Sequence, residues 1–525
     1  MIHGFLAAAL FVVIPAAAAT CESLATLSRP GTTITTAESV TDGSFKMPTG
    51  AAIEKLPAFC RVAGVIKPSS DSEIMFEVWL PSSGWNGKFY GVGNGGFAGS
   101  ITFPGLAAAL RRGFATAATD TGHAAGVTDA KWALAHHEKV VDFGYRAIHE
   151  TTATAKAVIA VFYDGAAKKS YFSSCSNGGR EALMEAQRYP ADYDGIVAGA
   201  PANNWTHLIS SGMWEAQALV SDTASYIPAA KLPAVEAAAL SACDANDGVK
   251  DGVIENPAAC HFDPAVLMCK GEESNSCLTE AQIGTLKKIY SGPQDSKGKP
   301  MYLGYSPGGE PGPNGWGGWI SGGGAGKSLQ YAFGTNFFKY MVFDNPDWDI
   351  TTFSVEHDMK VADDKVGQIL NATDANLKKF KDRGGKLIVY HGWSDAAIPP
   401  ANAIEYYKSV VAKMGAKQTD QFVRLFMVPG MQHCGGGPGP SNFGQTSDVD
   451  SDAQHDVNRA VEQWVESGIA PKQIIATKFK GANPASGVER TRPLCPYPQV
   501  AQWKGSGSTD DAANFTCVAG VRAAK

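Results

Sequence analysis

The sequence has no excess of positive charge. Its 525 residues carry 45 Lys and Arg against 51 Asp and Glu, which gives a formal net charge of −6. A nucleic-acid-binding protein neutralises the phosphate backbone with clustered basic side chains, and no such cluster is present here. We therefore expect no nucleic-acid partner.

Long apolar runs are absent beyond the N-terminus. Residues 5–19 form one apolar stretch, with Ala17 and Ala19 at the positions expected for signal-peptide cleavage, although no Lys or Arg precedes it. The stretch is shorter than the roughly 20 residues of a membrane-spanning helix, and a retained anchor is the alternative interpretation. The sequence predicts a signal peptide over residues 1–19, no membrane span in the mature chain, and a secreted or periplasmic protein.

The Cys-x-x-Cys pattern of zinc sites is absent as well. An even number of cysteines in an exported protein indicates disulfide bonds instead. Short spacings make three local pairs plausible: Cys243 with Cys260, Cys269 with Cys277, and Cys495 with Cys517. The other four cysteines are Cys21, Cys60, Cys175 and Cys434.

Strand-like and helical segments alternate from about Glu73 onward. The expected strands cover residues 75–80, 88–91, 114–119, 169–174 and 195–200, and the expected helices cover 140–163 and 177–188. This alternation predicts a parallel sheet with helices on both faces.

The pattern changes after Pro201. Cysteines cluster there, and residues 305–326 form a glycine-rich stretch in which we expect no regular element, until strands resume at 386–390 and 422–428. The middle third is therefore expected to be an insertion that forms a lid over the sheet. An independent second domain is the alternative.

A candidate nucleophile, Ser176, lies where an expected strand meets an expected helix. The sharp turn of a nucleophile elbow needs small residues two positions to either side, and Ser174 and Gly178 fill these positions. Because the first of them is Ser rather than Gly, the usual Gly-x-Ser-x-Gly pattern is only half met. The alternative is that Ser176 is a helix N-cap.

The other members of a catalytic triad follow two later strands. Asp395 comes after the strand at 386–390, and His433 comes after the strand at 422–428. The order Ser, Asp, His is that of α/β-hydrolases, which predicts Asp395 as the acid and His433 as the general base. His391 competes for the role of base, but its place at a strand end favours a structural role.

Two cysteines give a geometric argument for the same triad. Cys175 directly precedes Ser176, and Cys434 directly follows His433. A disulfide would hold their Cα atoms about 4.4 to 6.8 Å apart and bring Ser176 within reach of His433. Free thiols or other pairings are the alternative.

Backbone amides are the expected donors to the oxyanion. The amide of Asn177 follows the nucleophile, and the second donor is predicted to be Gly95 or Gly96, in a glycine-rich loop after an early strand. A phosphate-binding role for this loop is excluded because no Lys-Ser or Lys-Thr pair follows it.

Three carboxylates, those of Asp244, Asp247 and Asp251, follow Cys243 at short spacing, with glycines between them. This arrangement suits a calcium ion bound by oxygen ligands, with backbone carbonyls completing the site. It is not an EF-hand, and a solvated acidic turn is the alternative.

Together these motifs resemble the tannase and feruloyl esterase family, which also includes the hydrolase of mono(2-hydroxyethyl) terephthalate. The resemblance covers essentially the whole mature chain. It implies an α/β-hydrolase fold with a large inserted lid domain: a catalytic domain formed by residues 20–201 and 376–525, and a lid over 202–375. It also implies a structural Ca²⁺ held by Asp244, Asp247, Asp251 and the carbonyls of Val249 and Val253. The implied disulfides are Cys175–Cys434, Cys21–Cys60, Cys243–Cys260, Cys269–Cys277 and Cys495–Cys517.

The function implied by the resemblance is hydrolysis of esters of hydroxycinnamic or other phenolic acids through an acyl-enzyme, as in a feruloyl esterase. No organic cofactor is expected, and no metal is expected in the chemistry. The expected partner is a small aromatic ester, and the chain is expected to be a monomer or homodimer. Trp316, Trp319 and the aromatic side chains of 331–343 are candidates for binding the acid or for the lid core. The alternatives are a terephthalate monoester hydrolase, a gallate ester hydrolase, or a non-catalytic phenolic- or carbohydrate-binding protein.

Overall fold

The computed structural model of the protein describes residues 19–220, 222–312, 314–445 and 451–520. The predicted signal peptide, apart from Ala19, lies outside the described residues. Within the described ranges, no helix combines the length and apolar character that a membrane crossing requires.

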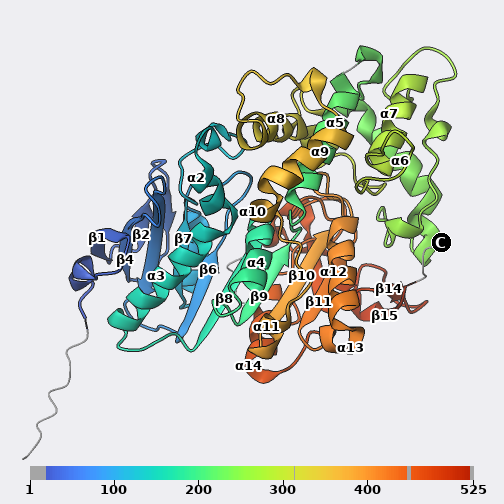
Figure 1. Ribbon diagram of the computed structural model, residues 1–525. Helices are drawn as coiled ribbons and strands as arrows, with labels where there is room; N and C mark the ends of the chain where they lie inside the picture. Colours follow the sequence, from blue (N-terminus) through green and yellow to red (C-terminus); the bar gives the residue numbers. More distant parts are fainter. Residues whose placement is uncertain (1–18, 221, 313, 446–450, 521–525) are drawn as a thin grey trace, which may run out of the picture.

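A nine-stranded mixed sheet forms the centre of the molecule (Figure 1). Its strand order is β1-β4-β5-β7-β6-β8-β9-β10-β11. The strands β7, β6, β8, β9, β10 and β11, which are neighbours in this order, pair parallel, as the sequence predicted. At one edge, β1, β4, β5 and β7 pair antiparallel, so the sheet is mixed. The bounds are β1 (Thr32–Val40), β4 (Phe59–Ile66), β5 (Ile74–Pro81), β6 (Lys88–Val92), β7 (Ala115–Thr119), β8 (Lys169–Cys175), β9 (Gly195–Gly199), β10 (Lys386–Gly392) and β11 (Val423–Val428).

Helices cover both faces of the parallel part, because its strands are apolar on both sides. Leu387 and Val389 of β10 belong to one core with helices α3 (Ala147–Phe162), α4 (Asn177–Arg188) and α12 (Ala401–Met414). Ile388 and Tyr390 point to the other face and pack with α14 (Val457–Ser467), beside α1 (Phe103–Arg111). This three-layered arrangement is that of an α/β-hydrolase, as the sequence predicted.

The long helix expected over residues 140–163 is interrupted. It consists of α2 (His137–Val141), a π-helical turn (Asp142–Arg146) and α3. The carbonyl groups of Phe143 and Gly144 in this turn accept hydrogen bonds from the Arg180 guanidinium, at 2.9 Å and 2.6 Å. Arg180 therefore satisfies carbonyl groups at the point where the α-helical pattern is broken.

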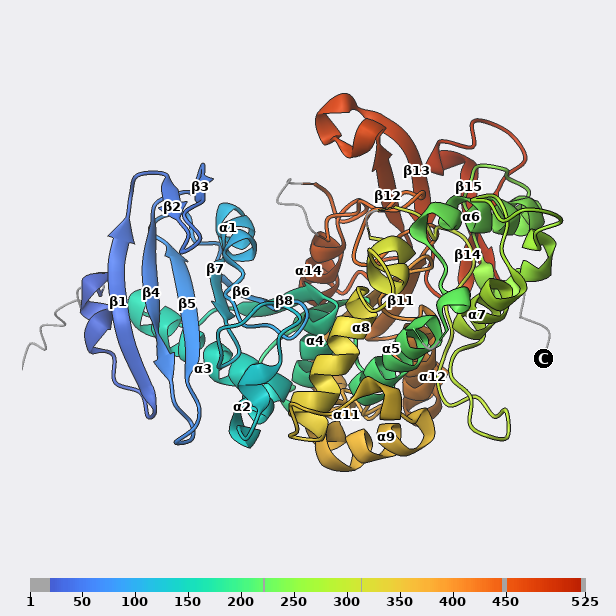
Figure 2. The ribbon, with the colours of Figure 1, turned by 90° about the horizontal axis from the view of Figure 1, so that it is seen from above.

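The chain between β9 and β10 contributes no described strand to the sheet and is largely helical. Figure 1 and Figure 2 together show α5, α8 and α9 above one end of the parallel strands, with α6 and α7 on the side of the molecule far from β1. A π-helical turn (Gly317–Ser321) lies inside the glycine-rich stretch, where no regular element was expected. The helices are α5 (Trp205–Val220), α6 (Leu232–Cys243), α7 (Glu280–Ser291), α8 (Leu329–Asn336), α9 (Val355–Ala362), α10 (Gln368–Leu370) and α11 (Lys378–Asp382).

The remaining elements are short. Three two-stranded antiparallel ribbons pair β2 with β3, β12 with β13, and β14 with β15, and α13 follows α12. Their bounds are β2 (Ser44–Lys46), β3 (Ala52–Glu54), α13 (Ala416–Thr419), β12 (Ile474–Phe479), β13 (Val488–Leu494), β14 (Gln499–Trp503) and β15 (Phe515–Ala519).

Candidate active site

Ser176 lies in a tight turn between β8 and α4. Its backbone has φ +67° and ψ −124°, a conformation that a non-glycine residue adopts only when its surroundings impose it. A Cβ atom at Gly178 would lie 1.9 Å from the Ser174 Oγ, so only glycine fits there. The Ser174 side chain, by contrast, is accommodated. The half-met sequence pattern thus forms the sharp turn that it predicted.

The Ser176 side chain makes no capping hydrogen bond to α4. Its Oγ instead lies 3.0 Å from His433 Nε2. On the other side of the ring, His433 Nδ1 lies 2.9 Å from Asp395 Oδ2. The hydrogen-bond chain has Ser176 donating to Nε2, and Nδ1–H donating to the carboxylate, which is the order required for nucleophile activation.

Asp395 is a buried carboxylate with several donors. Its Oδ1 accepts the backbone N–H groups of Ala397, at 2.8 Å, and Ile398, at 3.0 Å. Burial raises its pKa, but electrostatic attraction to the imidazole of His433 and hydrogen bonds from His391 and His433 outweigh burial and hold the pKa well below its usual value. The carboxylate is therefore ionised at neutral pH and able to orient and stabilise a protonated imidazole.

His391 lies on the far side of the same carboxylate. Its Nε2 is 3.2 Å from Asp395 Oδ2 and 3.2 Å from the carbonyl oxygen of Ile398. The His391 side chain is fully buried. His391 thus contacts Asp395, whereas His433 makes the hydrogen bond to Ser176.

Five disulfides occur in the structure. Cys175 and Cys434 are joined with their Cα atoms 6.0 Å apart, which links the residue before Ser176 to the residue after His433. The other four bonds are Cys21–Cys60, Cys243–Cys260, Cys269–Cys277 and Cys495–Cys517. These are the pairs that the family resemblance implies.

The glycine-rich loop over residues 91–96 lies against the start of α4. A Cβ atom at Gly178 would be 3.0 Å from the Asn94 carbonyl oxygen. At Gly96, where φ is +57°, a Cβ atom would come 2.3 Å from the Val127 carbonyl oxygen, while Gly95 borders open space. The loop and the buried Asn177 therefore lie at the same turn, beside Ser176.

Residues 308–311 of the inserted segment contact both loops that carry the predicted acid and base. Ser394 Oγ donates to the Gly308 carbonyl at 2.7 Å, and Gln432 Nε2 donates to the Gly309 carbonyl at 2.8 Å. The buried carboxylate of Glu310 accepts the Gly308 amide at 2.9 Å. The inserted segment thus supports the residues directly before Asp395 and His433.

Trp319, an aromatic residue between β9 and β10, contacts the triad. Its ring lies edge-on to His433 with centroids 4.9 Å apart, and it stacks parallel to Phe333 at 5.9 Å. Trp316, Phe337 and other aromatic side chains are buried in the interior of the insertion. Trp319 is half-buried beside His433, whereas Trp316 and Phe337 belong to the core.

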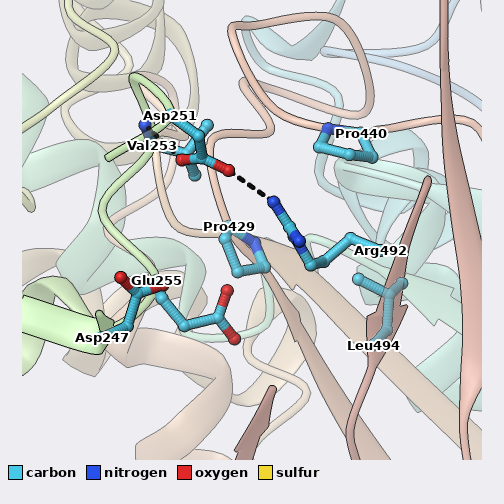
Figure 3. Close-up of a pocket in the computed structure, with 8 residues that line it drawn as sticks. All are labelled: Asp247, Asp251, Val253, Glu255, Pro429, Pro440, Arg492 and Leu494. Carbon is cyan, nitrogen blue, oxygen red and sulfur yellow. Dashed lines mark hydrogen bonds and ion pairs between the residues drawn. The ribbon is translucent and has the colours of Figure 1, made fainter. Parts of the chain in front are cut away.

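The predicted calcium loop follows α6 and faces β13. Asp247, Asp251 and Val253 line one small cavity, together with Glu255 and Arg492 (Figure 3). The carboxylate of Asp244 is directed instead at the backbone amides of Asp251 and Gly252, at 3.2 Å and 3.1 Å.

The carboxylates of this cavity are candidates for binding a cation. Burial raises the pKa of Asp247, with a further contribution from Asp251, and burial raises the pKa of Glu255 to about 8. Asp251 is already paired with Arg490, at 3.0 Å, and with Arg492. The positive charge of Arg492 also attracts Asp247 and Glu255, whose half-buried carboxylates are oxygen donors of the kind that fits Ca²⁺.

The cavity also lies close to the base-carrying loop. Pro429 forms part of its lining, and a Cβ atom at Gly430 would be 3.2 Å from Val253 Cγ1. The two loops are therefore neighbours, although they are far apart in sequence.

The chain is similar to known proteins of one esterase family. A family profile described as "Tannase and feruloyl esterase" matches residues 60–518. The chain is 46% identical to an uncharacterized esterase of Xanthomonas campestris pv. campestris, over 97% of this chain and 92% of the relative. It is 36% identical to the mono(2-hydroxyethyl) terephthalate hydrolase of Piscinibacter sakaiensis, over 90% and 87% of the two chains. The crystal structure of feruloyl esterase B from Aspergillus oryzae superposes with a TM-score of 0.88 at 33% identity, covering 95% of this chain and 99% of that one.

Proposed function

The chain belongs to the tannase and feruloyl esterase family, and we propose that within it the protein hydrolyses esters of hydroxycinnamic acids with Ser176 as nucleophile. Its membership makes it an esterase acting on a small-molecule ester. The observation that carries the finer proposal is the continuous contact of Ser176 with His433, and of His433 with Asp395.

Acylation begins with proton transfer from Ser176 Oγ to His433 Nε2 across 3.0 Å. The oxygen attacks the ester carbonyl carbon while Asp395, ionised and fully buried, stabilises the imidazolium. Amide N–H groups of Asn177 and of Gly95 or Gly96 stabilise the developing oxyanion. His433 then gives its proton to the departing alcohol, which leaves an acyl group on Ser176.

Deacylation repeats these steps with water. His433 removes a proton from the water, the hydroxide attacks the acyl carbon, and Ser176 takes the proton back when the acid leaves. The disulfide Cys175–Cys434 supports this cycle, because it restrains the segments of nucleophile and base in the same place for both halves.

Trp319 supports an aromatic acyl group. Its half-buried ring lies beside His433, so an aromatic acid bound to Ser176 would pack against it. A ferulate ester is our first choice. A terephthalate monoester is the second, since a relative of that name is 36% identical over 90% of this chain.

We also propose that the protein is exported and binds a structural calcium ion. Five disulfides support an oxidising compartment. Asp244, Asp247, Asp251 and the carbonyls of Val249 and Val253 would hold the ion, which would offset the negative charge of these carboxylates and take no part in the chemistry.

The test is a matched ester panel with purified, folded protein: methyl ferulate, methyl gallate, mono(2-hydroxyethyl) terephthalate and p-nitrophenyl butyrate. We expect the highest kcat/KM for methyl ferulate. A higher kcat/KM for the terephthalate or gallate ester would show that the preferred acid is terephthalic or gallic acid rather than a hydroxycinnamic acid. Negligible rates on all four would contradict aromatic ester hydrolysis, and saturable ferulate binding would then favour a binding protein.

A further inference from the structure

A buried carboxylate joins the two segments that carry the predicted oxyanion donors. Glu181 lies one turn after Asn177 on α4 and is 1% exposed. Its Oε2 accepts the backbone N–H of Asn94, and its Oε1 accepts from Asn177 Nδ2, each at 2.9 Å. Asn94 directly precedes Gly95. One carboxylate therefore bridges the glycine-rich loop and the residue after the nucleophile.

The loop is closely fitted to this carboxylate. A Cβ atom at Gly93 would lie 2.5 Å from Glu181 Oε2. On its other side, the Asn94 side-chain amide donates to the carbonyl groups of Ser100 and Thr119, each at 2.9 Å. The loop thus cannot move toward or away from α4 without breaking a buried hydrogen bond or creating a clash.

Arg180 fixes the other end of the Asn177 side chain. Its Nε donates to Asn177 Oδ1 at 2.8 Å, and the rest of its guanidinium is held by the carbonyl groups of the π-helical turn. Because Arg can only donate and an ionised Glu can only accept, the amide of Asn177 has one orientation that satisfies both.

These charges are expensive to bury. Burial raises the pKa of Glu181 to about 7, against the attraction of Arg180 and the hydrogen bonds from Asn94 and Asn177, and it lowers the pKa of Arg180 to about 10. Buried charged groups of this kind often add little net stability compared with apolar replacements. Their contacts with both segments that carry the predicted oxyanion donors indicate that they position these donors.

We propose that Glu181 is a positioning residue that sets the separation between the Asn177 amide and the amides of Gly95 and Gly96. The inference rests on the proposed function. Donors to an oxyanion act only if they are already in place when the charge develops, and they bind the transition state more strongly than the ester. Loss of the bridge should therefore lower kcat and leave KM nearly unchanged.

Glu181→Gln tests this with almost no change in shape. An amide offers one acceptor and one donor where both partners are donors, so one of the two hydrogen bonds must be lost. We expect kcat on methyl ferulate to fall about 10- to 100-fold, less than the roughly 10²- to 10³-fold of a fully removed donor, with KM within about twofold.

Glu185→Gln is the matched control. Glu185 lies one turn further along α4 and is also 1% exposed. Burial, together with the carboxylate of Asp192, raises its pKa, and among the described residues neither of its carboxylate oxygens accepts a hydrogen bond from the glycine-rich loop. This variant should keep the wild-type kcat. If kcat fell equally in the two variants, in proportion to a fall in their melting temperatures, the role of Glu181 would be merely structural. That result would overturn the proposal.

A tetrahedral inhibitor gives an independent measurement. Phenylboronic acid forms an adduct with a reactive serine that resembles the tetrahedral intermediate, and its affinity should fall in Glu181→Gln in parallel with kcat/KM. An unchanged inhibition constant together with unchanged kcat would refute the positioning role.

Asn177→Ala covers the case in which Glu181→Gln does not fold. It keeps the backbone donor and removes only the side chain that Glu181 holds, so kcat should again fall while KM stays. Wild-type kcat in Asn177→Ala would overturn the proposal in that case. A wild-type protein that hydrolyses no ester would refute the proposed function; an active wild type with unaffected variants would refute only the role of Glu181.

Discussion

The disulfide between Cys175 and Cys434 leads to a prediction that contains its own control. Its cysteines are 259 residues apart in sequence, whereas those of Cys269–Cys277 are 8 apart. In the chain-entropy description, a disulfide stabilises by an amount that grows with the logarithm of the loop it closes, which gives about 5.5 kcal/mol for the first bond and about 2.5 kcal/mol for the second. The first bond also links the segments of nucleophile and base, and the second does not.

The two bonds can be removed separately by replacing both cysteines of each pair with alanine. Unfolding by guanidinium should show that Cys175→Ala/Cys434→Ala is destabilised by about 3 kcal/mol more than Cys269→Ala/Cys277→Ala. On methyl ferulate, kcat should fall at least about 10-fold in the first variant only, because a small misplacement of reacting groups has a large effect on rate. An unchanged kcat in the first variant would refute the positioning of the triad by this bond, and equal destabilisation would refute the loop-length argument.

Three further predictions concern the acyl site, the metal and pH. Trp319→Ala should raise KM for methyl ferulate about 3- to 10-fold and affect p-nitrophenyl butyrate less, in steady-state assays; equal effects on both esters would remove the aromatic contact from the account. EGTA should lower the melting temperature, and Ca²⁺ should restore it, in the wild type but not in Asp247→Asn; a wild type insensitive to EGTA and Ca²⁺ would count against the ion. Burial raises the pKa of Glu215 from 4.5 to about 8, so the folded state binds a proton that the unfolded state has lost, and stability falls as pH rises through this interval. Glu215→Gln should therefore gain melting temperature relative to wild type as pH rises from about 5 to about 8, and a difference independent of pH would contradict this.

Sequence patterns were sufficient for the part of the fold that holds the nucleophile. The helix expected over residues 177–188 is α4, and the strands expected before and after it are β8 and β9. These elements are continuous apolar or amphipathic runs that end at glycine or at a polar turn, so local sequence fixes their type and their bounds. The elbow conformation of Ser176 follows from the same local residues, because Gly178 admits the close approach of Ser174.

Contacts between distant segments were not predictable in this way. The antiparallel edge formed by β1 and β4 depends on pairing across a long connection, and nothing local in the glycine-rich stretch indicates that it supports the acid and base loops. One feature of the sequence could have indicated that this stretch has a structural role: Glu310 is the only charged residue in residues 305–326. The contact between Glu181 and Asn177 could also have been predicted, because residues four positions apart lie on the same side of a helix.

The most direct test of the central claim is the rate of methyl ferulate hydrolysis by Ser176→Ala compared with wild type, both shown to be folded by their melting temperatures. Loss of the nucleophile in a triad of this kind removes most of the rate enhancement, and we expect kcat to fall by at least about 10⁴-fold. If Ser176→Ala retained a rate within about 10-fold of wild type, Ser176 would not be the nucleophile, and the mechanism proposed for this site would be wrong.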